Sequence, residues 1–198
     1  MTNAPSPSCF FLGALDDDAA ECGLRWFCHR VWPELNRRLP EAQFVITGWN
    51  GAGRVQDLSG VPGVIVVENI FDASTHIHQA PIVAFPYRQA CTIHDDLLHV
   101  LTMRKAVIAT PVVLEGLEVQ SSVHLRAAHT VSDWIAVTYH LLMHPEVCTR
   151  LGAAGRAYVE NHHPHALQFR SSVPEPASGK QPVAPQPKLI QEKIDQRV

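Results

Sequence analysis

The sequence lacks features that several large classes of protein require. Its 198 residues contain five widely spaced cysteines and no CxxC pair, so neither a zinc site of the common kind nor a redox dithiol is indicated. No stretch approaches the roughly 20 apolar residues that span a bilayer, and no basic residue precedes the short apolar run near the N-terminus. The net charge of −3 offers no basic field to nucleic acid. We therefore expect a reduced, cytoplasmic protein without a transmembrane segment or a nucleic-acid partner.

The chain has enough apolar material for one well-buried core, with 46% hydrophobic and 18% charged residues. Short apolar runs alternate with helical patterns, which is typical of βα units around a mostly parallel sheet. We expect strands at residues 9–12, 43–47, 64–67, 82–85 and 106–109. The last two are uninterrupted apolar runs, as in strands covered on both faces. The pattern predicts a single Rossmann-like, doubly wound α/β domain over residues 8–168.

Helical patterns fill the intervals between these strands. One begins near Asp16, Asp17 and Asp18, which suit a helix start, and continues to Leu39 with an interruption and a kink expected at Pro33. Two more are expected over 130–144 and 145–162. After about Arg170 the chain reads SSVPEPASGKQPVAPQPK, so we expect residues 169–198 to be a proline-rich disordered tail.

A family resemblance runs from about Cys9 to Leu167. It rests on the segments FLGALDDDAAECGLRWFCHRVWPEL, QFVITG, VPGVIVV, IVAFPYR, KAVIAT, LEGLEV and LGAAGRAYVE. In this order they resemble the C-terminal, donor-binding domain of GT-B glycosyltransferases of the group-one sugar transferase type. The resemblance implies one half of a GT-B fold and transfer of a sugar from a nucleotide donor to an acceptor. It also implies a complementary N-terminal acceptor-binding domain as partner, a nucleotide sugar as substrate and no separate cofactor. Catalytic residues stay unassigned.

The resemblance places a donor site after the fourth strand. In the family a glycine-rich turn presents free backbone N–H groups at a helix start to the diphosphate, and Ala90, Cys91 and Thr92 occupy that turn here, followed by Ile93 and His94. Asp96 stands where the family has a lysine, and it would repel an anion, although an acidic first turn also suits a helix dipole.

Many retaining members have two glutamates eight positions apart, and here those positions hold Cys91 and His99. A neutral imidazole at His99 offers one hydrogen bond to ribose, or is simply a helix-face histidine.

Further candidates lie at the ends of other strands. Gly13 closes the first strand, and Arg88 follows the fourth, where it supplies positive charge together with His94 or is merely solvated. Glu115, Gly116 and Leu117 begin a turn, continued by Glu118, that matches the family's EGLD segment. That turn either borders the donor pocket or is only a tight turn.

Other chemistries are less well supported by the residue patterns. The histidine groups His76-Ile77-His78 and His162-His163-Pro164-His165 lack the i, i+4 spacing of zinc hydrolases, although the second could capture a metal adventitiously. A phosphate-receiver domain would need an aspartate at the end of its third strand, where this chain has Val67-Glu68-Asn69. Two functions remain: a donor-binding part of a sugar transferase, or a degenerate, non-catalytic binding module of the same fold.

Overall fold

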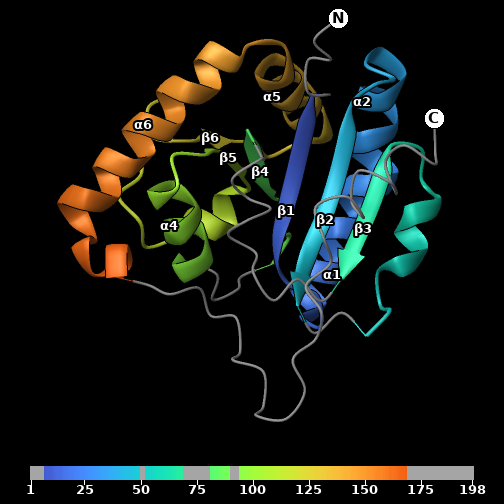
Figure 1. Cartoon of the computed structure of the whole chain (residues 1–198), viewed down its shortest axis with the longest axis horizontal. Coiled ribbons are helices and arrows are strands. Elements are labelled where there is room, and N and C mark those ends of the chain that lie inside the picture. The colour runs from blue at the N-terminus through green and yellow to red at the C-terminus, as the bar shows by residue number, and fades with distance from the viewer. Residues whose placement is uncertain (1–6, 50–51, 69–80, 90–93, 169–198) are drawn as a thin grey trace, which may run out of the picture.

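The computed structural model describes residues 7–49, 52–68, 81–89 and 94–168. Its centre is a six-stranded sheet in the order β3-β2-β1-β4-β5-β6, with every neighbouring pair parallel (Figure 1). The strands are β1 (Ser8–Ala14), β2 (Gln43–Trp49), β3 (Val64–Glu68), β4 (Ile82–Phe85), β5 (Ala106–Ala109) and β6 (Arg126–Ala127). This is the strand order of a doubly wound Rossmann fold, so the predicted fold class is confirmed.

Helices connect and cover these strands. They are α1 (Asp18–Trp26), α2 (Trp32–Arg38), α4 (His94–Thr102), α5 (Val131–Met143) and α6 (Pro145–His162), and a 3₁₀ turn, η4 (Pro164–Gln168), follows α6. In Figure 1, α1 and α2 lie behind β1 to β3, whereas α4 and α6 lie together beside β5. Among the described residues, no helix is both long and apolar enough to cross a membrane.

The interruption expected near Pro33 takes the form of a π-helical turn, Phe27–Val31, directly before α2. The backbone N–H of Trp32 donates to the carbonyl of Phe27, five residues earlier. Proline has no N–H to donate, and its ring clashes with the carbonyl four residues earlier in an α-helix. A wider turn ahead of Pro33 accommodates both effects.

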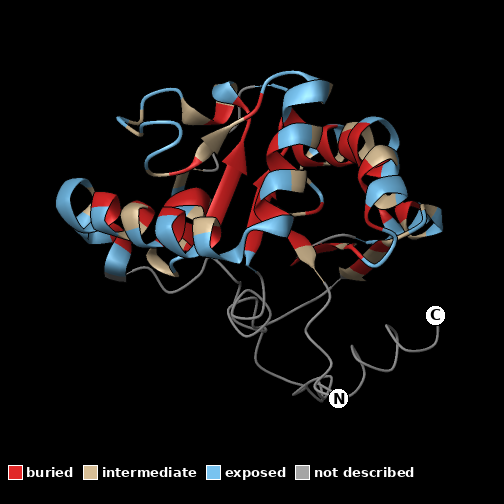
Figure 2. Ribbon diagram, turned by 90° about the horizontal axis from the view of Figure 1, so that it is seen from above, coloured by how far each residue is buried: buried red, intermediate tan, exposed pale blue. Residues whose placement is uncertain are grey.

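The π turn completes an aromatic core between β2 and α5. The ring of Phe27 lies 4.6 Å from that of Phe44 and 5.4 Å from that of Trp134, and Trp32 lies 5.5 Å from Phe44. All four side chains are fully buried. Figure 2 shows the central strands as buried and the outward turns of the helices as exposed. Removing large aromatic side chains such as these four from water is the main source of stability in such a domain.

Helix α5 has a specific N-terminal cap. The Thr130 hydroxyl accepts from the Asp133 backbone N–H at 3.1 Å, while the Asp133 carboxylate accepts from the Thr130 N–H at 2.8 Å. Two otherwise unpaired helix donors are satisfied in this way. The helix predicted over 130–144 is therefore confirmed with its start at this cap.

Helix α6 packs unusually closely against the chain after α4. A methyl group added at Gly152 would lie 2.0 Å from the backbone oxygen of Arg104. The absence of a side chain at Gly152 is what permits this approach, so α6 is positioned by backbone contact as well as by its apolar face.

The sequence did not predict β6, because a strand of two residues is too short to show an alternation of apolar and polar side chains. The tail predicted over residues 169–198 lies outside the described residues. The disorder of the tail and the C-terminal boundary of the domain at residue 168 therefore remain predictions.

Candidate functional site

The carboxyl ends of β1, β4 and β5 meet at one edge of the sheet. β1 and β4 are neighbours although they are not consecutive, so the chain reverses its winding direction between them. Ligands of open α/β sheets bind in the crevice outside such a switch point. Of the sequence-predicted residues, Gly13 is the last but one residue of β1, Arg88 follows β4 and Glu115 lies beyond β5, all at this edge.

Gly13 lies against a tyrosine that the sequence analysis did not single out. A methyl group added at Gly13 would lie 3.0 Å from the Tyr87 hydroxyl and 3.0 Å from Phe11 Cζ. Tyr87 is buried, and its backbone carbonyl accepts a hydrogen bond from the Thr110 hydroxyl. The loops after β4 and β5 are therefore tied to each other beside the end of β1.

The segment Leu114–Leu117 forms a tight turn. Leu117 donates its backbone N–H to the Leu114 carbonyl at 3.1 Å, Glu115 has φ −59° and ψ 127°, and Gly116 has φ +84°. These angles define a type II turn, whose third position needs the positive φ that glycine adopts freely. The predicted turn is thus confirmed as backbone geometry, and its role toward a donor stays a prediction.

His94 faces that turn. A methyl group added at Gly116 would lie 3.9 Å from Cε1 of His94, the first residue of α4. The structure therefore brings together two of the predicted site segments, the start of α4 and the turn after β5. Glu115 and Gly116 are exposed at this junction.

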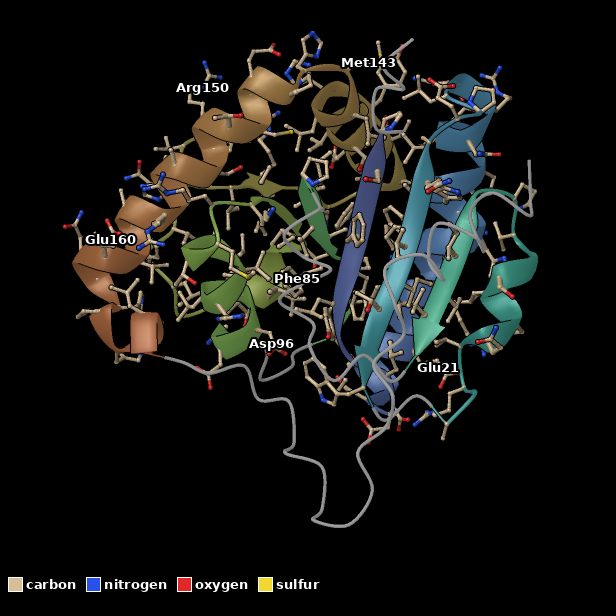
Figure 3. The ribbon with its side chains drawn as sticks, viewed as in Figure 1. Glu21, Phe85, Asp96, Met143, Arg150 and Glu160 are labelled. Carbon is tan, nitrogen blue, oxygen red and sulfur yellow. The ribbon has the colours of Figure 1, made fainter. Side chains whose placement is uncertain are left out.

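Asp96 is half-buried on the first turn of α4. In Figure 3 it lies at the lower end of that helix, and the arrowheads of β2 and β3 also point to the lower side of the view. Burial, followed by the nearby carboxylate of Asp95, raises the pKa of Asp96 to about 6. The carboxyl group is therefore mostly ionised at neutral pH, and among the described residues no ion pair offsets the solvation that it loses on burial. A lysine at this position would have the opposite charge.

His99 lies one turn further along α4. Its ring is partly buried, burial lowers its pKa, and its Nδ1 is buried without a hydrogen-bond partner among the described residues. A neutral imidazole with an unused nitrogen can make one further hydrogen bond. Because Nδ1 is buried, it is not accessible to a ligand in this structure, and the predicted ribose contact stays a prediction.

Arg88 points toward α1. Its guanidinium carbon lies 4.7 Å from the centre of the Trp26 ring, a cation–π contact. The backbone preceding it passes close to α1, since a methyl group at Gly23 would lie 2.5 Å from the Pro86 oxygen. The positive charge predicted for the donor site is thus engaged with an aromatic ring of α1. The sequence offers no separate signal for this role of Trp26, because its position in the helical pattern does not distinguish it from ordinary core residues.

The three remaining candidates, Cys91, Thr92 and Ile93, lie outside the described residues, as do His76 and His78. No group of three or more histidine, cysteine or acidic side chains in the described ranges is arranged to hold a metal ion.

The receiver-domain alternative is contradicted by topology. Asp16 and Asp17 after the first strand and Lys105 beside a late strand are the residues that favour a receiver site, which would bring them together. Asp17 lies after β1, where it caps α1 by accepting from the Ala19 N–H, whereas Lys105 precedes β5 and so lies at the opposite edge of the sheet.

Comparison with known proteins identifies a family. A family model described as "Glycosyl transferases group 1" matches residues 6–143. No curated protein sequence matches the chain.

Solved structures with the same fold agree with that match. The C-terminal domain of a group 1 glycosyl transferase (LpcC) from Francisella tularensis is similar with a TM-score of 0.63 at 12% identity, over 78% of this chain and 85% of that one. Sucrose-phosphate synthase from Thermosynechococcus elongatus gives 0.62 at 16% identity, over 83% and 44%. S. aureus TarM, solved in complex with UDP among other ligands, gives 0.62 at 10% identity, over 82% and 34%. The chain therefore spans most of an isolated C-terminal domain, but less than half of the two longer proteins.

Proposed function

Because the chain belongs to the glycosyl transferases of group 1, we propose that its domain is the donor-binding half of a sugar transferase. The observation that carries the proposal is the meeting of the α4 start with the type II turn after β5, beside the β1–β4 switch point. Helix starts at such points offer free N–H groups to phosphate. The ligand class that fits is a nucleoside diphosphate sugar.

The residues proposed to contact this donor come from four segments. They are Gly13 near the end of β1, Arg88 after β4, Cys91, Thr92 and Ile93 before α4 in sequence with His94, Asp96 and His99 on that helix, and Glu115, Gly116 and Leu117 in the turn. His94 would face the phosphates and His99 the ribose. The donor is the substrate, and no further cofactor is proposed.

Charge at this site favours weak binding at neutral pH. The ionised carboxylate of Asp96 repels a diphosphate, and Arg88 is engaged with Trp26. Transfer further requires an acceptor and catalytic groups, which we propose come from a complementary N-terminal domain or subunit. This agrees with the chain spanning 34% of TarM and 44% of sucrose-phosphate synthase.

A direct binding experiment tests the proposal. UDP, GDP and their sugar conjugates are each titrated to about 5 mM while thermal unfolding and backbone amide NMR shifts are followed. A ligand with Kd of about 1 mM would stabilise the domain by about 1 kcal/mol at that concentration. This corresponds to a rise in Tm of about 2–4 °C for a domain of this size. Absence of any response, by either method and with every ligand, would refute donor binding.

The half-buried carboxylate of Asp96 favours a second candidate, a non-catalytic module that keeps the fold and no longer binds a donor. The double variant Asp96→Lys, His99→Glu restores the charges typical of the family and should bind a nucleoside diphosphate sugar more tightly than the unmodified chain. The matched control is Asp95→Lys with Asp96 and His99 kept, which makes the same change of charge as Asp96→Lys alone but on the exposed side of α4. Equal affinity of the unmodified chain and the double variant would exclude the degenerate module.

A further inference from the structure

Two exposed histidines lie side by side where α5 ends. His140 is in the last turn of α5, and His144 caps the helix. The centres of their rings are 4.3 Å apart, and the ring planes meet at 34°. Figure 3 shows Met143, the residue before His144, near the top of the view and Asp96 at the lower end of α4. The histidine pair is therefore separate from the candidate donor site.

The local sequence explains why the two rings meet. Pro145 follows His144, and proline disfavours the α-helical backbone for the residue before it. His144 accordingly leaves the helix, with φ −131° and ψ 76°. Its ring turns back over the last turn of α5, where Nδ1 lies 2.7 Å from the backbone carbonyl oxygen of His140. This contact holds the ring of His144 beside that of His140.

The same hydrogen bond decides which nitrogen of His144 can bind a ligand. A carbonyl oxygen can only accept, so Nδ1 carries the proton and donates it. In the neutral imidazole the lone pair then belongs to Nε2. Metal-binding histidines typically donate their other ring N–H to a backbone carbonyl or a carboxylate, which orients the ring. His144 therefore has the tautomer and the supporting contact of a metal ligand.

The separation of the two rings suits a single metal ion. A ring nitrogen binds such an ion at about 2.0 Å, which places the ring centre about 3.2 Å from the metal. Two imidazoles bound at about a right angle then have ring centres roughly 4.5 Å apart, which is close to the observed 4.3 Å. His140 is exposed, so its ring can turn a nitrogen toward the same point. The partial negative charge at the C-terminal end of α5 further favours a cation there.

We propose that His140 and His144 form a two-imidazole binding site for a divalent transition-metal ion of the late first row. Imidazole nitrogen suits Cu²⁺, Ni²⁺ and Zn²⁺, of which Cu²⁺ is bound most tightly. No third histidine, cysteine or acidic side chain in the part of the chain that the structure describes joins the pair, so water completes the coordination. The bound ion would fasten the cap of α5 to its last turn. This binding does not depend on a sugar donor.

Copper binding followed by NMR tests the site directly. Cu²⁺ is paramagnetic and broadens the signals of nearby nuclei. It is added stepwise, up to one equivalent, to the full chain at about pH 7.5, where protons compete weakly for the ligands. We expect the amide signals of residues 140–148 to lose intensity. Full intensity of these signals at one equivalent, whatever happens at the histidines near the end of α6, would overturn the proposal.

Single variants test whether both rings hold the ion. Losing even an outer-shell partner typically weakens metal binding by about 10–100-fold, so His140→Gln and His144→Gln should each weaken Cu²⁺ binding at this site by at least about tenfold. The matched control is His29→Gln, which removes an exposed histidine of the π turn and should leave the affinity unchanged. Equal affinity of the unmodified chain and either single variant would refute chelation by the pair. Should a variant fail to fold, the signals of residues 140–148 in the unmodified chain still decide whether the ion binds there.

Discussion

Replacing Asp96 by asparagine should stabilise the domain at neutral pH. The substitution keeps the shape of the side chain and removes the charge that is half-buried on the first turn of α4. The expected gain follows from the raised pKa of Asp96, whose carboxyl group is more easily accommodated in its neutral form.

The pKa of Asp96 sets the magnitude and its dependence on pH. A rise from the usual 3.8 to about 6 corresponds to about 3 kcal/mol at roughly 1.4 kcal/mol per pH unit. Remaining contact with solvent screens part of this, so we expect about 1–3 kcal/mol. Because the folded-state pKa is raised, the favourable contribution of the neutral acid is complete below 3.8 and is lost as pH rises through about 6. The advantage of Asp96→Asn should therefore be full at about pH 7.5 and small at about pH 4.

Urea unfolding at those two pH values measures the effect. With an m-value of about 2 kcal/mol/M, the midpoint of Asp96→Asn should lie about 0.5–1.5 M above that of the unmodified protein at about pH 7.5. Asp95→Asn is the matched control, since it lies on the same helical turn but is exposed. Its midpoint should change by much less, because losing a favourable helix-dipole contact offsets the relief of repulsion with Asp96.

Two outcomes would refute the reasoning on Asp96. One is an equal or lower midpoint for Asp96→Asn at about pH 7.5, which would mean that the ionised carboxylate is well solvated or paired. The other is a gain of the same size at both pH values, which would mean that the substitution acts through packing or helix propensity and not through charge.

Three further predictions concern the scaffold and its thiols. Gly152→Ala should destabilise the domain by several kcal/mol, because the added methyl group meets the Arg104 backbone oxygen at 2.0 Å, whereas Gly60→Ala, with nothing within 4 Å, should change stability by less than about 1 kcal/mol in the same urea assay. Thr130→Ala should cost about 1 kcal/mol through loss of the α5 cap, and an unchanged midpoint would show that the cap is replaced by solvent. Cys22 is exposed and should be alkylated by N-ethylmaleimide in the native state, whereas the buried Cys9, Cys28 and Cys148 should react only on unfolding, because burial also raises the pKa values of their thiols. Site-resolved mass spectrometry measures both, and native alkylation of a buried thiol would contradict the prediction.

Much of the fold was predictable because strands and helices have characteristic patterns of apolar residues within short stretches of sequence. The apolar runs at residues 82–85 and 106–109 coincide with β4 and β5, and the helices predicted over 130–144 and 145–162 coincide with α5 and α6 within a residue. The π turn was not predicted, since the sequence shows only that Pro33 disturbs a helix and not how the chain adapts.

The candidate site was predictable only in part. The Glu115 turn could be placed because Gly116 is the residue that a type II turn requires. Tyr87 was missed, since it follows a strand as an ordinary core residue would, and its hydroxyl meets Gly13, which is distant in sequence, only in the folded chain. The contact of Arg88 with Trp26 was missed for the same reason.

The sequence by itself determined the class of this protein, a doubly wound α/β domain of the group 1 glycosyl transferases. It also has Asp96 and His99 at positions for which the family resemblance predicts a lysine and a glutamate. These properties are encoded in short segments and in residue identity, which need no knowledge of packing. Only the tertiary structure decided that Asp96 is half-buried, that His94 faces the turn at Gly116, and that Arg88 lies over the ring of Trp26. Burial, and with it the pKa of each group, depends on which elements lie side by side across the whole chain.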